Sequence, residues 1–129
     1  MLLALRHTRV WLAAGWLLVI LACVGSIVPL RDLPSAPLPN DKVQHIAAYA
    51  LLALWFAGIY PRSRYVVIGI SLFLMGICIE WVQGAMHLGR QSDLRDVLAN
   101  SFGIVVGLTL ALIWLGGWAQ RVESWTRKS

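Results

Sequence analysis

The chain has 129 residues, of which 59% are hydrophobic and 13% are charged, and its mean hydropathy is +0.72. A soluble domain carries about 25% charged residues, so this composition excludes an ordinary soluble domain and predicts a protein that faces lipid. The net charge of +5 does not indicate a nucleic-acid partner, because the basic residues lie at the ends of apolar runs and form no basic stripe with interleaved aromatic residues.

Four apolar runs are each close to the ~20 residues that a helix needs to cross a bilayer. Backbone polar groups cannot stay unpaired in lipid, so helices are the expected structure of such runs. The runs cover about residues 10–28, 43–60, 65–83 and 97–118. The sequence therefore predicts an all-α membrane protein with four transmembrane helices and short connectors, and we expect residues 1–129 to form a single integral membrane domain.

The first predicted helix carries no charge, and the connector after it holds four of the five prolines, so this connector should be extended. At the start of the second predicted helix, Asp41, His45 and Tyr49 are spaced four residues apart and share one helical face. Lys42 lies beside them. Charged and polar groups are costly inside a membrane, so each of these residues requires a partner or a ligand.

The third and fourth predicted helices repeat this feature. Glu80 and Gln83 are three residues apart near the end of the third helix. The available partners for Glu80 are His45, Arg90 and Lys42. The fourth helix carries a stripe with the period of a packed helical face. Its members are Asp93, Asp96, Asn100, Gly103 and Gly107. The two glycines form a G-x-x-x-G pair, which lets another helix approach closely and would also serve a homodimer.

In a chain of four spans, the start of the second helix, the end of the third and the start of the fourth lie at the same membrane face. The polar residues are therefore expected within about two turns of that face, where they form one site. The catalytic candidates are His45, Glu80 and Asp96. The ligand-binding candidates are Asp41, Lys42, Tyr49, Gln83, Arg90, Asp93 and Asn100.

These residue types allow several kinds of chemistry. A buried pair of Glu80 and His45 suits proton transfer, and Arg90 beside it could hold a phosphate. Asp93 and Asp96 could instead hold a divalent cation, although the sequence identifies no cofactor. The HExxH, CxxC, P-loop and G-x-S-x-G patterns are absent from the sequence, so an enzymatic reaction is left open.

The distribution of lysine and arginine predicts the orientation in the membrane. The N-terminal segment, the second connector and the C-terminal tail hold seven of these residues, whereas the first and third connectors hold four. The positive-inside rule then places both termini in the cytoplasm. The predicted polar site would face the outer side of the membrane.

Taken in order, the polar residues resemble the motifs of the VanZ-like family, which are small bacterial integral membrane proteins named after a protein tied to teicoplanin resistance. The resemblance covers about residues 39–107. It is carried by Asp41-Lys42-x-x-His45-x-x-x-Tyr49, Glu80-x-x-Gln83 and Arg90-x-x-Asp93-x-x-Asp96-x-x-x-Asn100-x-x-Gly103. It implies a role in the cell envelope but supplies no agreed reaction.

We therefore expect a multi-pass protein of the bacterial inner membrane that is surrounded by membrane lipids. Its polar site would bind or modify an anionic envelope ligand, such as a lipid head group or a lipid-linked cell-wall precursor, and would be linked to the glycopeptide antibiotic response. The alternative is a non-catalytic structural or assembly partner, in which hydrogen bonds of the polar cluster only lock the helices together.

Overall fold

The computed structural model describes residues 1–27, 41–86 and 93–126, and within these ranges every regular element is helical. The elements in chain order are α1 (Thr8–Ile27), α2 (Asp41–Ile59), the 3₁₀ turn η2 (Arg62–Arg64), α3 (Tyr65–Met86), α4 (Leu94–Leu110), the π-helical turn η3 (Ala111–Leu115) and α5 (Trp118–Thr126). The prediction of an all-α chain is confirmed.

Four segments are long and apolar enough to cross a membrane. They are Thr8–Ile27, Asp41–Ile59, Arg62–Met86 and Leu94–Leu115. The fourth ends three residues before the predicted boundary at Trp118. Gly116 leaves the helix with an extended backbone (ψ 134°), and Gly117 then adopts a left-handed backbone (φ 67°) before α5 begins. The predicted four membrane-spanning helices are otherwise confirmed.

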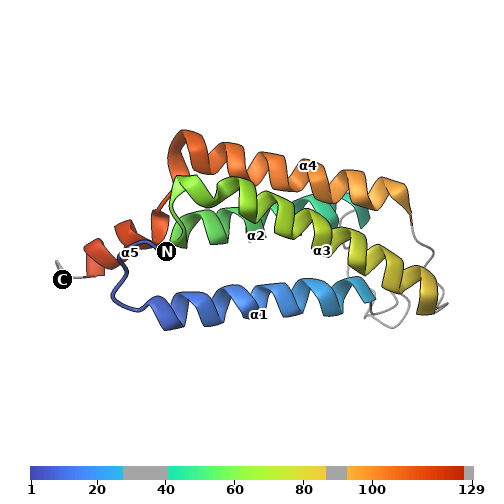
Figure 1. The fold of residues 1–129 in the computed structure, drawn as a ribbon, viewed down its shortest axis with the longest axis horizontal. Coiled ribbons are helices and arrows are strands. Elements are labelled where there is room, and N and C mark those ends of the chain that lie inside the picture. Colours follow the sequence, from blue (N-terminus) through green and yellow to red (C-terminus); the bar gives the residue numbers. More distant parts are fainter. Residues whose placement is uncertain (28–40, 87–92, 127–129) are drawn as a thin grey trace.

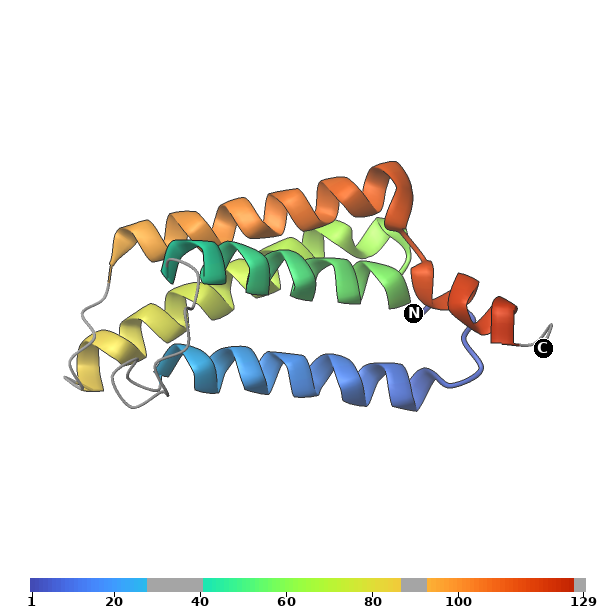
Figure 2. The ribbon, with the colours of Figure 1, turned by 180° about the vertical axis from the view of Figure 1, so that it is seen from behind.

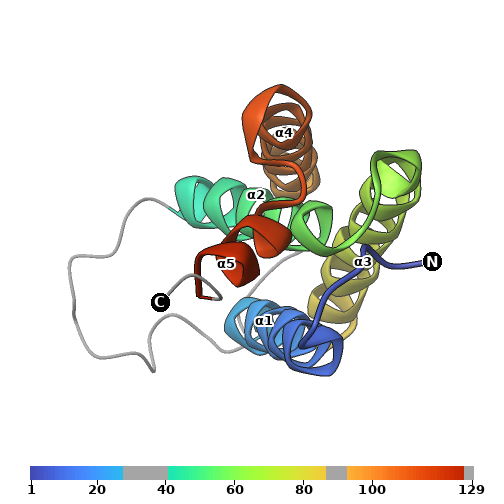
Figure 3. The ribbon, with the colours of Figure 1, turned by 90° about the vertical axis from the view of Figure 1, so that its left-hand side faces the viewer.

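Helices α1 to α4 run side by side along the long axis of the molecule, and both termini lie at one end of it (Figure 1). Figure 2 shows the same arrangement from behind, with α5 at the end that holds the termini. Viewed along the helices, α2 lies between α4 on one side and α1 on the other, with α3 beside it (Figure 3). Helix α2 is therefore the centre of the bundle.

The closest helix pair is α2 with α4, and two glycines make the approach possible. A Cβ atom on Gly107 would lie 2.5 Å from the backbone oxygen of Ala50, and one on Gly103 would overlap the backbone oxygen of Ile46. The predicted small-residue stripe is thus used within the chain, against α2. The homodimer stays a prediction.

Helix α1 is the least buried of the four spans, and Gly15 is its single buried residue within the described chain. Near its start, the ring of Trp11 lies 5.8 Å from that of Trp55 and 5.2 Å from that of Trp118, between ring centroids. Near its other end, the backbone oxygen of Ser26 accepts a hydrogen bond from α3. Most of the remaining side-chain surface of α1 is left to face lipid.

Glu123 on α5 holds the segment that precedes α1. Its carboxylate accepts hydrogen bonds from the backbone N–H of Arg6 (2.6 Å), the backbone N–H of His7 (2.9 Å) and the indole N–H of Trp11 (2.8 Å). Burial raises the pKa of this carboxyl, but the three hydrogen bonds outweigh that effect and hold the pKa below its usual range.

We expect this contact to make part of the protein's stability dependent on pH. A lowered pKa in the folded state means that the unfolded state takes up the proton more readily, so the stabilisation is complete above the unfolded pKa of about 4.3 and is lost as pH falls through the folded pKa. Thermal unfolding in detergent should show that the stability of the wild type falls more steeply at acid pH than the stability of Glu123→Gln. Superimposable pH profiles of the two proteins would contradict this role of Glu123.

Candidate functional site

The polar residues gather at the end of the bundle opposite the termini, where α2 begins, α3 ends and α4 begins (Figures 1 and 2). Five polar or charged residues of the described chain are buried, and all five belong to the predicted site. They are His45, Glu80, Gln83, Asp96 and Asn100. The predicted convergence of polar residues from the second, third and fourth helices at one end of the bundle is confirmed for the described residues. Their functional roles stay predictions.

His45 is oriented by Asn100. The ring Nδ1 of His45 on α2 lies 2.8 Å from the side-chain oxygen of Asn100 on α4. An amide oxygen only accepts, so Nδ1 carries the hydrogen and Nε2 is directed to the other side of the ring. There Nε2 lies 3.7 Å from a carboxylate oxygen of Asp96 and 3.9 Å from one of Asp41. Nε2 therefore faces two carboxylates at distances longer than a hydrogen bond.

Lys42 joins the start of α2 to the start of α4. Its ammonium group lies 3.0 Å from a carboxylate oxygen of Asp93 and also donates to Asp96. Asp93 caps the N-terminus of α4, because its side chain accepts from the backbone N–H of Arg95 at 2.9 Å. The hydrogen bond from Arg95, and next the one from Lys42, hold the pKa of Asp93 below its usual range.

Glu80 brings α3 to the same site. One of its carboxylate oxygens accepts from the backbone N–H of Asp93 at 3.0 Å. The other oxygen is buried and has no hydrogen-bond partner among the described residues, and the same holds for the hydroxyl of Tyr49. Both the hydroxyl of Tyr49 and the amide of Asn100 pack against Gly76, where a Cβ atom would lie 3.3 Å and 3.1 Å from them. Buried polar atoms without a protein partner are rare, and water, an ion or a catalytic role commonly accounts for them.

Gln83 differs from the other predicted ligand-binding residues. Its amide donates to the backbone oxygen of Ser26 and so ties α3 to α1. The sequence did not indicate this contact, because a backbone carbonyl acceptor has no residue-type signal. Arg90 lies outside the described residues. Gly76 was also missed, although a glycine one helical turn before Glu80 on α3 is consistent with a close approach of Tyr49.

The described site is rich in acid. It contains the carboxylates of Asp41, Glu80, Asp93 and Asp96, and the ammonium of Lys42 pairs with two of them. Ligand atoms of Asp41, His45 and Asp96 all lie within 4.8 Å of one another. One imidazole and two carboxylates suit a divalent transition metal. A metal-binding histidine commonly donates a hydrogen bond from its other ring nitrogen, and here Asn100 accepts that hydrogen bond from Nδ1.

The carboxylates that the sequence offered for a cation, Asp93 and Asp96, both accept from Lys42, and Asp93 also caps α4. Their pairing as metal ligands stays a prediction. Asp41 and His45 lie with Asp96 in a group of possible metal ligands among the described residues. The reason is that Asp41 and His45 are one turn apart on α2, which faces Asp96 across the tight contact between α2 and α4.

No family model and no solved structure matches the chain. A curated relative is an uncharacterized protein of Schizosaccharomyces pombe, which is 31% identical over 86 residues, or 63% of this chain and 52% of the relative. The chain thus spans about half the length of the curated relative that it matches. Because this relative is a yeast protein of undescribed activity, the similarity gives no support to a bacterial inner membrane and identifies no ligand.

Proposed function

We propose that this chain is a VanZ-like membrane protein whose polar site binds the anionic head group of an envelope ligand, either a lipid or a lipid-linked cell-wall precursor. One observation carries the proposal. Three buried ionisable residues, His45, Glu80 and Asp96, come from three different helices and meet at one end of a bundle that is otherwise lipid-facing. Ionisable groups at membrane depth are costly, and they usually serve a ligand, an ion or a proton.

An anionic ligand and an acid-rich site are compatible if a divalent cation lies between them. In this proposal Asp41, His45 and Asp96 hold the cation, and the ligand phosphate completes its coordination. Lys42, whose side chain is 34% exposed, lies at the rim of the site where it can contact the head group. The proposed location is the outer face of the bacterial inner membrane, with both termini in the cytoplasm.

If the bound ligand is also modified, Glu80 is the residue to transfer the proton. Its unpaired oxygen is buried next to the cluster, and electrostatic interactions link its carboxyl to Asp96, His45 and Lys42. A carboxyl group with one oxygen held by the backbone N–H of Asp93 and the other unengaged can accept or donate a proton without moving.

The structural alternative also has a specific observation in its favour. The contacts of Lys42 with Asp96 and of His45 with Asn100 both join α2 to α4. Such interhelical hydrogen bonds contribute about 0.6 kcal/mol each on average in membrane proteins, so they can lock a helix pair without any ligand. The two proposals differ in one observable: a binding site retains a ligand during purification, whereas a purely structural cluster does not.

Mass spectrometry of lipids and precursors that copurify with the protein, combined with elemental analysis, tests the proposal. We expect the wild type to retain an anionic envelope ligand and a divalent metal, and His45→Gln to retain at least about tenfold less of both. Tyr65→Phe is the matched control, because it removes a buried hydrogen bond to Ala57 at the opposite end of the bundle. Equal ligand and metal content in wild type and His45→Gln would overturn the proposal. The link to the glycopeptide response has its own test: unchanged teicoplanin susceptibility after deletion of the protein would remove that link.

A further inference from the structure

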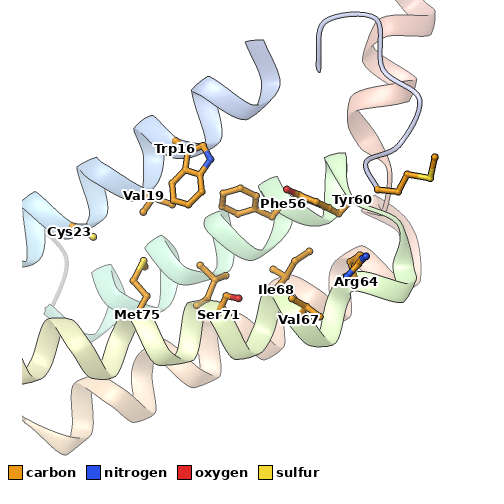
Figure 4. Close-up of a pocket in the computed structure, with 12 residues that line it drawn as sticks. Trp16, Val19, Cys23, Phe56, Tyr60, Arg64, Val67, Ile68, Ser71 and Met75 are labelled. Carbon is orange, nitrogen blue, oxygen red and sulfur yellow. The ribbon is translucent and has the colours of Figure 1, made fainter. Parts of the chain in front are cut away.

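A recess lies between α1 and α3, apart from the polar cluster. Its volume is about 490 Å³, within the range of ~300–1,000 Å³ that is typical of ligand sites. Figure 4 shows Trp16 and Val19 of α1 on one side and Ile68 and Met75 of α3 on the other, with Phe56 of α2 between them. The walls are almost entirely apolar.

The recess lies between two hydrogen bonds that hold α1 to the rest of the bundle. The indole N–H of Trp55 donates to the backbone oxygen of Trp11 at 3.1 Å near the start of α1, and Gln83 binds Ser26 near its end. Between these contacts the small residues Ser71 and Cys23 line the opening. An apolar recess at this depth is surrounded by hydrocarbon rather than by water, so a hydrocarbon chain is its natural occupant.

The length of the recess matches one leaflet of a bilayer. It extends from Arg64 of η2 to Met75 of α3, which is about 16 Å at ~1.5 Å per residue. The hydrocarbon core of a bilayer is ~30 Å thick, so this distance is close to the depth of a single leaflet. A lipid with its head group at Arg64 would place its acyl chain along the whole recess.

The charge at the mouth of the recess identifies the head group. Arg64 is exposed and lies with Tyr60 at the end nearest the termini (Figure 4). Among the described residues, no carboxylate pairs with the guanidinium of Arg64. A guanidinium group binds phosphate through paired hydrogen bonds. The predicted orientation places this end at the cytoplasmic leaflet, which carries the anionic lipids that basic residues attract.

We infer that this recess binds one anionic glycerophospholipid, with its phosphate on Arg64 and one acyl chain between α1 and α3. The inference goes beyond the proposed function, because the recess has its charged mouth at the opposite membrane face and uses none of the polar-cluster residues. Either site can fail its test without affecting the other.

Native mass spectrometry of the full-length protein in detergent tests this site with phosphatidylglycerol and phosphatidylcholine of identical acyl chains. We expect the wild type to retain phosphatidylglycerol about fivefold better, as a single basic residue near the membrane surface provides. Arg64→Gln should abolish this preference. Arg62→Gln is the matched control, because the guanidinium of Arg62 donates to the backbone oxygen of Leu112 and lies outside the recess.

A second variant separates the acyl-chain site from the head-group site. Ser71→Trp places a large side chain in the recess from an exposed position, so both lipids should be lost while thermal unfolding stays unchanged. Glycerol phosphate, which lacks an acyl chain, should not compete. The inference is overturned if the wild type shows no preference, if Arg62→Gln and Arg64→Gln behave alike, if Ser71→Trp retains both lipids, or if glycerol phosphate displaces the lipid.

Discussion

Replacing Gly103 with alanine is expected to force α2 away from α4 and to destabilise the folded protein by about 2–3 kcal/mol, the upper part of the range for overpacking. The added Cβ would overlap the backbone oxygen of Ile46 and lie 3.1 Å from the backbone nitrogen of Ala50. Both atoms belong to the backbone of α2, so no side-chain rotation can relieve the overlap. The whole helix must shift, and the polar contacts between α2 and α4 must shift with it.

The experiment compares unfolding of Gly103→Ala with that of Gly25→Ala in the same detergent. A Cβ on Gly25 would meet nothing within 4 Å, and alanine is favoured over glycine in a helix by about 1 kcal/mol. Gly25→Ala should therefore be neutral or stabilising. Equal stability of the two variants would show that the tight contact between α2 and α4 is absent from the folded protein.

Lys42→Gln is also expected to lower the stability of the folded protein strongly. It leaves the carboxylate of Asp96, which is 8% exposed, without its ammonium partner. Removing one member of a buried ion pair costs ~3–5 kcal/mol. The side chain of Lys42 is 34% exposed, so solvent screening reduces our expectation to about 2 kcal/mol. The charge left behind, rather than the lost attraction, accounts for most of this effect.

A double-mutant cycle separates these contributions. Lys42→Gln combined with Asp96→Asn should be more stable than the sum of the two single effects predicts, with a coupling of about 1–2 kcal/mol. The pair of Lys42 and Asp93 serves as the internal comparison, since the side chain of Asp93 is 43% exposed and its coupling should be smaller. Strictly additive effects for Lys42 and Asp96 would contradict the buried contact.

The fold and the location of the site could be predicted because both depend on strong periodic signals. The apolar runs predict the four spans, and alternation of the spans brings the starts of α2 and α4 to the same end as the end of α3. The spacing of Asp41 and His45 then predicts a shared face. Burial of all five polar residues in one cluster agrees with that reasoning.

The partners within the site could not be predicted, because they depend on how far each helix is rotated and shifted against its neighbours. Gln83 has the same spacing signal as Glu80, yet it binds the backbone of Ser26 on α1. Asp93 has the same residue type as Asp96, yet it caps α4 and pairs with Lys42. The recess beside α1 is likewise invisible in the sequence, since an apolar helix looks the same whether it packs tightly or faces lipid.

The central claim is that the polar cluster binds a ligand. The most direct test is to measure the amount of ligand retained per folded protein in His45→Gln and Glu80→Gln. Both changes preserve the fold-supporting contacts. The amide introduced by His45→Gln can still donate to the oxygen of Asn100, and the amide oxygen introduced by Glu80→Gln can still accept from the N–H of Asp93. The predicted result is folded protein at about the wild-type amount in the membrane for both variants, with ligand retention reduced at least about tenfold in His45→Gln. Loss of folded protein with unchanged ligand per folded molecule would contradict a binding site and would assign the cluster to helix packing alone.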